Sequence, residues 1–273
     1  MAGRVLRRPA AHWTSPGGER VLVVAPHPDD EVAGCGGTIL LHRERGDEVV
    51  VCFATDGRRS RSLGLSPDEM AERRRLEALA AARTLGLTYV DWLGLPEGDW
   101  CAPDFHRSVR KLMDTYRPSL IYAPSLVDYH RDHLSVAVEL ASVLQASPDR
   151  SGIRMRAYQV QVPLTPILTN LLAVTGRVSG STRQAAADYV SQRGSLERCM
   201  RMKRYAAAFH GVEGGEAEEF WELSVDSYCR VHPVTLVETA RAFQGVWHLP
   251  VRDPVSYLTD LDRRRLLRQL ARA

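Results

Sequence analysis

One short segment of the chain combines an imidazole with three consecutive carboxylates. It runs from His27 to Glu31, with Asp29 and Asp30 between them, and it follows the apolar run 21–25. A run of that length is too short for a helix and indicates a buried strand. Negative charge at the end of a buried strand is costly unless a cation lies nearby, so the segment predicts a divalent metal site. A solvated acidic loop is the alternative.

A second cluster of histidine and aspartate lies much further along the chain. Asp128, His130, Asp132 and His133 follow another apolar run, 120–123, and they open a helical pattern. Two histidines spaced three positions apart at the entrance of a helix can face in one direction. An aspartate beside them can hold one ring in place through a hydrogen bond. We therefore expect both clusters to build one metal site.

Three residues from the two clusters make a complete ligand set. Catalytic zinc is commonly held by three protein ligands that offer nitrogen or oxygen, and the fourth position is left to water. We predict that His27, Asp30 and His133 are these ligands. The expected cofactor is Zn²⁺. Another divalent transition metal is the alternative, because affinity alone discriminates poorly among such ions.

Strands and helices alternate along the first half of the chain. The clearest helix start is Ser66-Pro67-Asp68-Glu69, which has a capping serine, a proline and a glutamate three positions on. The alternation predicts an α/β fold with a doubly wound, mostly parallel, Rossmann-like sheet and helices on both faces. Ligands bind such sheets beyond the carboxyl ends of the strands, where both clusters fall. The expected strands are 21–25, 48–55, 88–93 and 120–123, and the expected helices are 36–46, 66–85 and 104–116.

The pattern is weaker beyond residue 150, where we expect a smaller C-terminal α+β part. A strand is predicted at 153–162 and a helix at 195–209, whereas the polar stretch 172–187 is expected to be mobile. Further strands are predicted at 220–223 and 228–231. The tail 257–272 is predicted to be a basic amphipathic helix that packs on the protein or associates with another copy, so a homo-oligomer is compatible with the sequence.

Length and hydrophobic content indicate a single catalytic domain. The chain has 273 residues and 44% hydrophobic content, enough to bury one substantial core with a smaller appendage. We expect an N-terminal extension (1–18), a Rossmann-like metal-binding core (19–160), a part that completes the substrate pocket (161–250) and a C-terminal helix (251–273).

Charge and cysteine usage exclude several classes of protein. A net charge of +3 is small for this length, and basic clusters alternate with acids, so we expect no nucleic-acid partner. No apolar run approaches the length of a membrane span, so we expect no membrane partner. The cysteines are scattered and odd in number, which favours reduced thiols in the cytoplasm over a disulfide framework. They are Cys35, Cys52, Cys101, Cys199 and Cys229.

Taken together, the two clusters resemble the metal motifs of the LmbE-like/PIG-L family of zinc-dependent N-deacetylases. The family also has an Arg-x-x-Glu-x-x-x-Ala-x-x-x-Leu-Gly helix, and this chain matches it. The resemblance covers roughly residues 20–145 and continues more weakly through Lys203 to His210, where Gly211-Val212 replace the Ser-Gln that the family often has. The matching positions are His27, Pro28, Asp29, Asp30, Glu31, His130, Asp132 and His133, with Arg74, Glu77, Ala81, Leu85 and Gly86 in the helix.

The resemblance implies roles for the residues around the metal. Asp29, which is not a ligand in the family pattern, is the expected general base for the attacking water. Protonated His130 is expected to stabilise the tetrahedral oxyanion, and Asp132 to keep His130 cationic by raising its pKa. Either His130 or Asp29 would protonate the departing amine. Glu31 is expected to orient a ligand or the neighbouring backbone.

Four further residues are predicted to contact the substrate. Arg74 resembles the arginine of the family helix and would hold a hydroxyl or a phosphate, with an ordinary exposed helix arginine as the alternative. Asp56 and Glu97 follow predicted strands and would bind sugar hydroxyls, or else serve as turn or cap residues. His210 would line the pocket, although a lone histidine is more often structural.

The sequence therefore indicates a cytoplasmic zinc amidohydrolase that removes an N-acyl group, expected to be acetyl, from a small N-acylated amino sugar or glycoconjugate. The resemblance implies two settings, low-molecular-weight thiol biosynthesis and natural-product biosynthesis. Asp128 stands where thiol-precursor deacetylases tend to carry tyrosine, and Tyr129 is displaced by one, which favours the natural-product setting. An amidase acting on a larger thiol conjugate and a non-catalytic metal- or sugar-binding module are the alternatives.

Overall fold

The computed structural model describes residues 10–231, except 127, 129, 149, 162, 165–167 and 214. The helices are α1 (Asp30–Glu44), α2 (Pro67–Thr84), α3 (Ala102–Tyr116), α4 (Arg131–Ala146), α5 (Ser179–Asp188), α6 (Arg193–His210) and α7 (Val225–Val231), with 3₁₀ turns η1 (Gly176–Val178) and η2 (Val190–Gln192). The strands are β1 (Ala11–His12), β2 (Arg20–Ala25), β3 (Glu48–Thr55), β4 (Val90–Leu95), β5 (Leu120–Pro124), β6 (Arg154–Tyr158), β7 (Leu171–Val174) and β8 (Ala217–Ser224).

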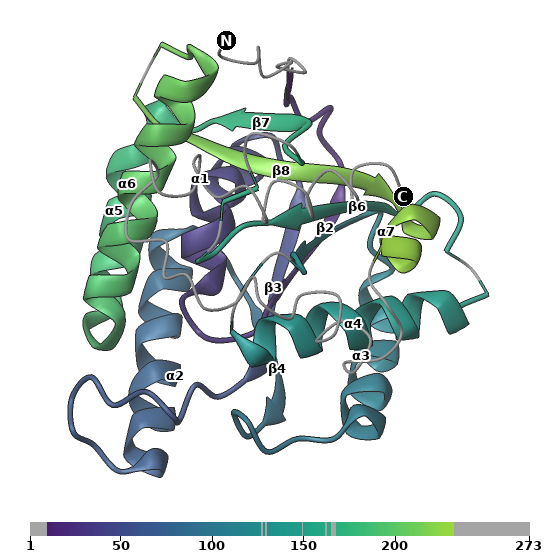
Figure 1. The fold of residues 1–273 in the computed structure, drawn as a ribbon, viewed down its shortest axis with the longest axis vertical. Coiled ribbons are helices and arrows are strands. Elements are labelled where there is room, and N and C mark those ends of the chain that lie inside the picture. Colours follow the sequence, from purple (N-terminus) through teal and green to yellow (C-terminus); the bar gives the residue numbers. More distant parts are fainter. Residues whose placement is uncertain are drawn as a thin grey trace, which may run out of the picture.

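All these strands belong to one sheet. Their order is β1-β7-β8-β6-β5-β2-β3-β4, and every pair is parallel except the two that β8 makes with β6 and β7 (Figure 1). The predicted fold class, a mostly parallel α/β sheet, is therefore confirmed. The strands β7 and β8 come from the segment beyond residue 160 and extend the same sheet, so this segment does not fold as a separate layer.

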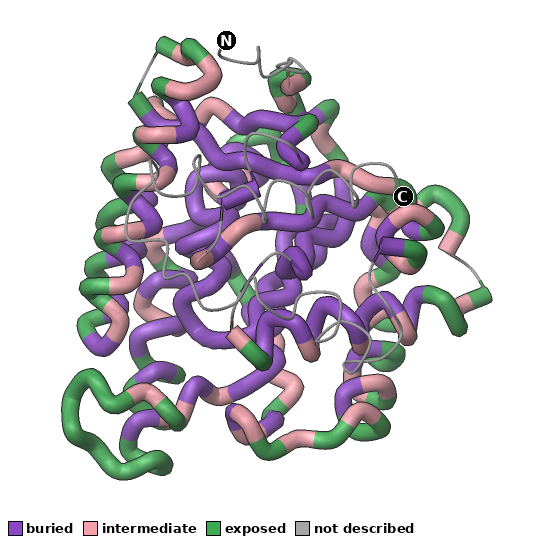
Figure 2. The backbone as a smooth tube through the Cα atoms, viewed as in Figure 1, coloured by how far each residue is buried: buried purple, intermediate pink, exposed green. Residues whose placement is uncertain are grey.

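Helices cover both faces of the sheet because the central strands are apolar on both sides. In β2, Val21 and Val23 contribute to a core with α1, α2, α5 and α6, whereas Leu22 and Val24 contribute to a second core with α3, α4 and α7. Alternate residues of a strand point to opposite faces, so an unbroken apolar run supplies both cores. Figure 2 shows the buried sheet and inner helix faces, with the exposed residues on the outside.

The strand order places a topological switch point beside β2. From β2 the chain adds β3 and then β4 on one side, and it then returns to place β5 on the other side of β2. β2 is parallel to both β3 and β5, and Val21 pairs with Val49 on one side and with Leu120 on the other. The carboxyl ends of the three strands therefore lie at the same edge of the sheet. A crevice at such a switch point is the usual place for a ligand in this class of sheet.

Most predicted elements of the first half are confirmed, and α2 has the predicted capping box. Ser66 accepts the backbone N–H of Glu69, while the Glu69 side chain accepts the backbone N–H of Ser66. The start of α1 is different from the prediction. It begins at Asp30 rather than at residue 36. Glycine is needed inside this helix because a Cβ at position 34 would overlap the Tyr158 ring, and a Cβ at position 37 would overlap the Thr175 side chain. The sequence pattern marks such glycines as a turn, whereas close packing keeps them in the helix.

Two predictions for the second half are wrong. The stretch 172–187, expected to be mobile, forms part of β7, the turn η1 and most of α5. Residues 228–231, expected to be a strand, lie in α7, where the Tyr228 hydroxyl donates to the carbonyl of Ala137 in α4. A short apolar run does not by its pattern distinguish a strand from a buried helical turn, and packing against α4 decides it.

The predicted C-terminal helix 251–273 lies outside the described residues. Within the described part of the chain, no helix combines the length and apolar character that a membrane span requires.

Candidate metal centre and active site

The first cluster folds into a tight turn between β2 and α1. The backbone N–H of His27 donates to Oδ2 of Asp30 over 2.9 Å, which ties the turn to the first residue of the helix. Asp29, between them, has a φ of 135°, a region that residues other than glycine rarely adopt. Its backbone N–H donates to Oε2 of Glu31 over 3.0 Å. Such strain is typical of functional sites, where the surrounding contacts hold the backbone in place.

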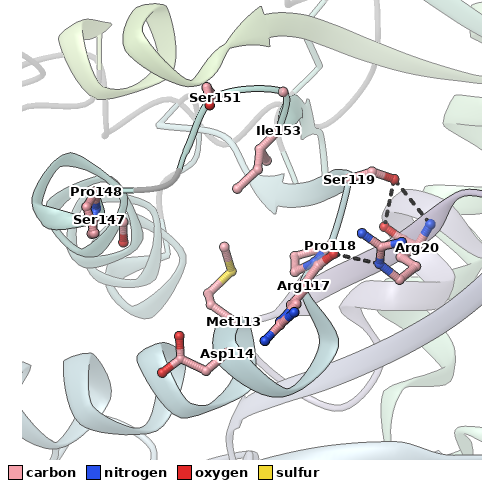
Figure 3. A pocket seen from close by; sticks show the side chains of 11 residues that line it. Arg20, Met113, Asp114, Arg117, Pro118, Ser119, Ser147, Pro148, Ser151 and Ile153 are labelled. Atoms are coloured by element: carbon pink, nitrogen blue, oxygen red, sulfur yellow. Dashed lines mark hydrogen bonds between the residues drawn. The ribbon is translucent and has the colours of Figure 1, made fainter.

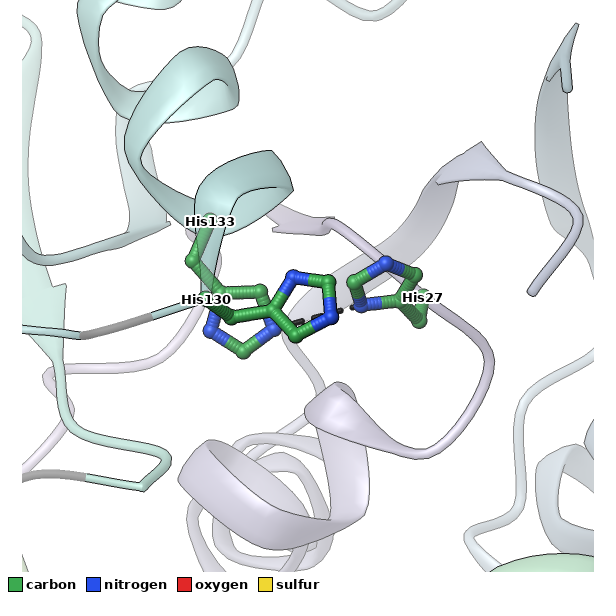
Figure 4. Close-up of side chains that lie close together, drawn as sticks. All are labelled: His27, His130 and His133. Carbon is green, nitrogen blue, oxygen red and sulfur yellow. Dashed lines mark hydrogen bonds between the residues drawn. The ribbon is translucent and has the colours of Figure 1, made fainter. Parts of the chain in front are cut away.

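Three potential ligand atoms from the two clusters form a nearly equilateral triangle. Nδ1 of His27 lies 3.2 Å from Oδ2 of Asp30 and 3.2 Å from Nε2 of His133, and Asp30 Oδ2 lies 3.1 Å from His133 Nε2. The edge of a zinc tetrahedron with bonds of about 2.0–2.1 Å is roughly 3.3–3.4 Å. The two nitrogens and one oxygen therefore fit a single divalent ion, and Figure 4 shows the His27 and His133 rings facing one another.

Charged neighbours favour the metal-binding form of the Asp30 carboxylate. Burial by itself would raise the pKa of Asp30, but the imidazoles of His133 and His27 outweigh it and hold that pKa well below its usual range. The carboxylate therefore stays ionised although it is buried. Sequence reasoning placed these three residues in one site, and the structure brings them together.

Asp128 orients His133 from behind. Its Oδ2 lies 3.0 Å from Nδ1 of His133, which leaves Nε2 directed toward the triangle. Its Oδ1 accepts the backbone N–H of His130 over 2.9 Å. A carboxylate behind a ligating histidine fixes the tautomer of the ring and strengthens it as a ligand. This role belongs to Asp128 rather than to Asp132.

Asp132 lies behind His27 instead. Its Oδ2 is 3.4 Å from Nε2 of His27, and its Oδ1 accepts the indole N–H of Trp100 over 3.3 Å. Glu97 reaches the same side of the His27 ring, with Oε1 3.6 Å from Nε2. The nitrogen of His27 that faces away from the triangle is thus surrounded by carboxylates.

The surroundings of His130 oppose the protonated form that the sequence led us to expect. Burial, together with the imidazoles of His27 and His133, lowers the pKa of His130 to about 4. Its Nδ1 accepts the backbone N–H of Asp132 over 3.3 Å at the start of α4. A ring that accepts at Nδ1 is neutral and carries its proton on Nε2, which lies 3.9 Å from Oε1 of Glu97. The surroundings of His130 therefore favour the neutral ring, in which Nε2 is an N–H donor, over the cationic form expected from the sequence.

Arg74 is committed to Asp29 and is not open to solvent. The Arg74 side chain is buried, and its Nη2 donates to Oδ1 of Asp29 over 2.6 Å and also to the carbonyl of Pro28. Its Nη1 donates to the carbonyl of Gly57 over 3.3 Å. Burial raises the pKa of Asp29 to about 6, and the Arg74 guanidinium opposes the rise. Arg74 borders the cavity but is engaged with the turn that carries Asp29.

The cluster opens into a polar cavity of about 200 Å³. Of the predicted substrate contacts, Glu97 and Arg74 line this cavity. Sequence reasoning missed several lining residues on the loops after β3 and β6 and near the start of α6. Position after a strand was the available signal for some of them, whereas nothing in the pattern singled out those near α6. The missed residues are Arg59, Ser60, Gln161, Gln192 and Ser195.

Asp56 and His210 do not line the cavity. Asp56 Oδ1 accepts the backbone N–H groups of Arg58 and Glu97, and its Oδ2 accepts Nε of Arg58 over 2.7 Å. Asp56 is thus the turn residue that the sequence offered as its alternative role. His210, at the end of α6, lies with Nε2 2.8 Å from Oε1 of Glu219. Both side chains are therefore engaged by local partners, and neither is among the residues that line the cavity.

A larger groove of about 670 Å³ lies at the opposite edge of the sheet (Figure 3). Arg20, which begins β2, and Arg117, which follows α3, contribute to its lining. Among the described residues that line this groove there is no histidine, and Asp114 is the one carboxylate. Its side chains offer no ligand set and no paired acid and base, so the chemistry belongs to the smaller cavity.

Known proteins share both the motifs and the fold. The family model of the GlcNAc-PI de-N-acetylases (PIG-L) matches residues 22–144. Diacetylchitobiose deacetylase of Thermococcus kodakarensis is 35% identical over 123 residues, which are 42% of this chain and 45% of that protein. The chain therefore spans less than half the length of this relative.

Solved structures show the same architecture over most of the chain. N,N′-diacetylchitobiose deacetylase of Pyrococcus horikoshii superposes with a TM-score of 0.67 at 24% identity, covering 76% of this chain and 85% of that one. The 4-carboxy-2-hydroxymuconate hydratase GalB of Pseudomonas putida KT2440 superposes with a TM-score of 0.64 at 20% identity, covering 74% of this chain and 95% of that one. The fold alone is thus compatible with more than one reaction. The sequence motifs are more specific than the fold, because residues 22–144 match the PIG-L family model.

Proposed function

We propose that this protein is a metal-dependent amidohydrolase that removes an N-acyl group, in the first place acetyl, from an amino sugar or a glycoconjugate. The observation that carries the proposal is that three potential metal ligands lie next to a carboxylate, that of Asp29, which is not one of them. Nδ1 of His27, Oδ2 of Asp30 and Nε2 of His133 lie 3.1–3.2 Å apart, and Asp29 lies next in the chain to one of them with its carboxylate held by Arg74. A pure binding module has no need of such a base.

His27, Asp30 and His133 would hold the metal, and zinc suits their two nitrogens and one oxygen. When bound, zinc lowers the pKa of a water molecule toward neutrality and polarises the acyl carbonyl. The carboxylates behind His27 and the Asp128 carboxylate behind His133 orient the two rings for this task.

Asp29 acts as the general base. Its carboxylate lines the cavity beside the ligand triangle but belongs to no edge of it, so it is available to accept the proton of the attacking water. Arg74 fixes one carboxylate oxygen, Oδ1, so Oδ2 would be the oxygen that accepts the proton. The same carboxyl group then returns the proton to the departing amine.

His130 stabilises the oxyanion in its neutral form. Nδ1 of the ring accepts a hydrogen bond from the backbone N–H of Asp132, so the proton of the neutral ring is on Nε2. This N–H is the donor that His130 offers to the cavity. A neutral N–H donor stabilises developing negative charge on the carbonyl oxygen without any prior protonation. This assignment leaves the acid step to Asp29, because a neutral imidazole is a weak proton donor.

The cavity favours a small and polar substrate. Its volume of about 200 Å³ is below the roughly 300–1,000 Å³ of sites for drug-sized ligands, and its lining is rich in carboxylates, amides and hydroxyls. One sugar ring with its acyl group suits this space better than a large thiol conjugate. The names of the matched family and of the chitobiose-acting relative support the same class of substrate.

The test is amide hydrolysis by the purified, zinc-loaded protein. A panel of N-acetylated glucosamine glycosides is incubated with the protein, and both acetate and free amine are quantified. Asp29→Asn, with zinc content measured in parallel, is the matched inactive control. The proposal predicts equal release of acetate and amine above this control. Absence of release across the panel by protein with one zinc per chain would overturn it in favour of a binding module.

A further inference from the structure

Arg59 places an unpartnered guanidinium at the wall of the catalytic cavity. It lines the same cavity as His27, Asp29 and His130. Among the described residues, no side chain or carbonyl forms a hydrogen bond or ion pair with its guanidinium, although the residue before it, Arg58, pairs with Asp56 and Asp68. The five N–H donors of Arg59 are therefore free for a ligand.

The backbone around Arg59 is held on two sides. Its N–H donates to Oε2 of Glu97 over 2.7 Å, so the loop after β3 is tied to the loop after β4. Its neighbour Ser60 accepts Nε2 of Gln192 over 3.0 Å, which ties the loop to η2. The position of the Cα of Arg59 is thus set by long-range contacts, while its side chain remains exposed.

Gly98 provides the space in which the guanidinium lies. A Cβ added to Gly98 would overlap Nη1 of Arg59 and would lie 3.0 Å from its Cδ and Cζ, so the side chain packs directly on the glycine backbone. Gly98 also has a φ of +72°, which suits the turn after β4. This packing directs Arg59 along the wall of the cavity.

The other charged groups of the cavity are already engaged. Arg74 is paired with Asp29, Asp30 belongs to the ligand triangle, and Glu97 accepts the backbone N–H of Arg59. Among the described residues lining the cavity, Arg59 is the cation without a partner. An arginine guanidinium binds a carboxylate or a phosphate through paired, charge-assisted hydrogen bonds.

We propose that Arg59 is a specificity-determining residue that binds an anionic group of the substrate. The substrate is then an N-acyl amino sugar whose aglycone carries a carboxylate or a phosphate. This inference rests on the proposed function, which supplies the amide that is hydrolysed, and it adds a preference for a negatively charged aglycone.

The experiment compares four α-glycosides of N-acetylglucosamine that differ in charge: the neutral methyl glycoside, the carboxymethyl glycoside, the 1-phosphate and the cationic 2-aminoethyl glycoside. Values of kcat/KM are measured for the zinc-loaded wild-type protein, for Arg59→Gln and for Arg61→Gln. Arg61 is an exposed arginine of the same loop that does not line the cavity, so it controls for long-range charge. The carboxymethyl and phosphate arms separate the two sources of the anion.

The expected result is a wild-type preference for at least one anionic glycoside over the methyl glycoside. Arg59→Gln should reduce this ratio of kcat/KM values by roughly 10–100-fold, mainly through KM, because a hydrogen bond to a charged group is lost. The ratio should stay unchanged in Arg61→Gln. An Arg59→Glu variant should reverse the preference toward the cationic 2-aminoethyl glycoside. Equal ratios in the wild type and Arg59→Gln would overturn the assignment.

A binding experiment separates this inference from the proposed function. Calorimetry measures the affinity of the same glycosides for the zinc-loaded Asp29→Asn variant and for the zinc-loaded Asp29→Asn/Arg59→Gln double variant. Failure of turnover with retained, Arg59-dependent preference for anionic glycosides would overturn the proposed function alone and support the anion site. Turnover of the neutral glycoside without any preference for the anionic ones would overturn the anion site alone.

Discussion

Arg74 donates from Nη2 to Oδ1 of Asp29 over 2.6 Å, and both side chains are buried. The same nitrogen donates to the carbonyl of Pro28, so one guanidinium holds both the backbone and the side chain of the turn. A residue with φ of 135° costs on the order of 1–3 kcal/mol unless its surroundings enforce it. Arg74 is thus placed to position the base, whereas its match to the family helix implied a substrate contact.

Replacement of Arg74 should therefore reduce kcat more than it raises KM. Arg74→Gln removes the charge and the Nη2 donor that holds Asp29 Oδ1, and we expect kcat to fall roughly 10²-fold because a small misplacement of a catalytic group has that effect. Arg74→Lys keeps the charge but not the paired donors, and we expect it to recover only part of the loss. Steady-state kinetics on an N-acetylglucosamine glycoside checks this. A large rise in KM at constant kcat would restore the role of substrate contact.

Asp128 should control metal affinity without touching the metal. Its Oδ2 lies 3.0 Å from Nδ1 of His133, and Asp128→Asn weakens the charge behind the ligating ring. Loss of such a partner typically reduces metal affinity about 10–100-fold. Competition for zinc against a chelator of known affinity measures the change. Asp114→Asn, in the distant groove, is the matched control and should bind zinc as the wild type does.

His130 should tolerate a neutral donor in place of the imidazole. His130→Ala removes the donor that faces the cavity, and we expect kcat to fall about 10²–10³-fold with zinc retained. His130→Gln keeps an N–H donor and should retain clearly more activity than His130→Ala. If instead both variants lost the same activity, and the wild type lost its rate as pH rose through the range in which an imidazolium deprotonates, the cationic role predicted from the sequence would be correct.

His42 should make stability depend on pH at the edge of the sheet opposite the metal site. Its Nδ1 lies 2.5 Å from Oδ2 of Asp47, and its Nε2 accepts the hydroxyl of Tyr122, which in turn accepts Nη1 of Arg156. Glu19 lies 4.0 Å from the same Nδ1. Burial lowers the pKa of His42 to about 4, although Asp47 opposes this. The folded protein therefore holds this ring neutral.

Because the pKa of His42 is lower in the folded than in the unfolded chain, the unfolded chain binds the proton first as pH falls. Its contribution is present above about pH 6.5 and is lost between about 6.5 and 4, up to an amount on the order of 3 kcal/mol. Urea unfolding of metal-free protein at pH 7 and pH 5 measures the loss. His42→Gln should show a shallower pH dependence than the wild type, whereas His12→Gln, an exposed change, should not. Identical slopes in all three proteins would refute this assignment.

The sequence by itself determined the metal motifs and the class of fold. The apolar runs before His27 and before Asp128 had to be strands of one parallel sheet, because each is buried on both faces and helices separate them. Parallel strands present their carboxyl ends at one edge, so adjacent motifs meet there whatever the details of packing. Local pattern and topology are therefore sufficient to bring His27, Asp30 and His133 beside one another, as the structure shows.

Only the tertiary structure decided how the remaining polar side chains are used. Arg74, Asp56 and His210 were predicted to contact the substrate, but each has its partners elsewhere: Arg74 in the turn of Asp29, Asp56 in its own loop and at Glu97, and His210 at Glu219. Arg59 was not singled out from the sequence, although among the described residues it is left without a partner at the cavity wall. A buried charge takes the partner that packing brings within hydrogen-bond distance, and sequence spacing does not encode such distances between loops.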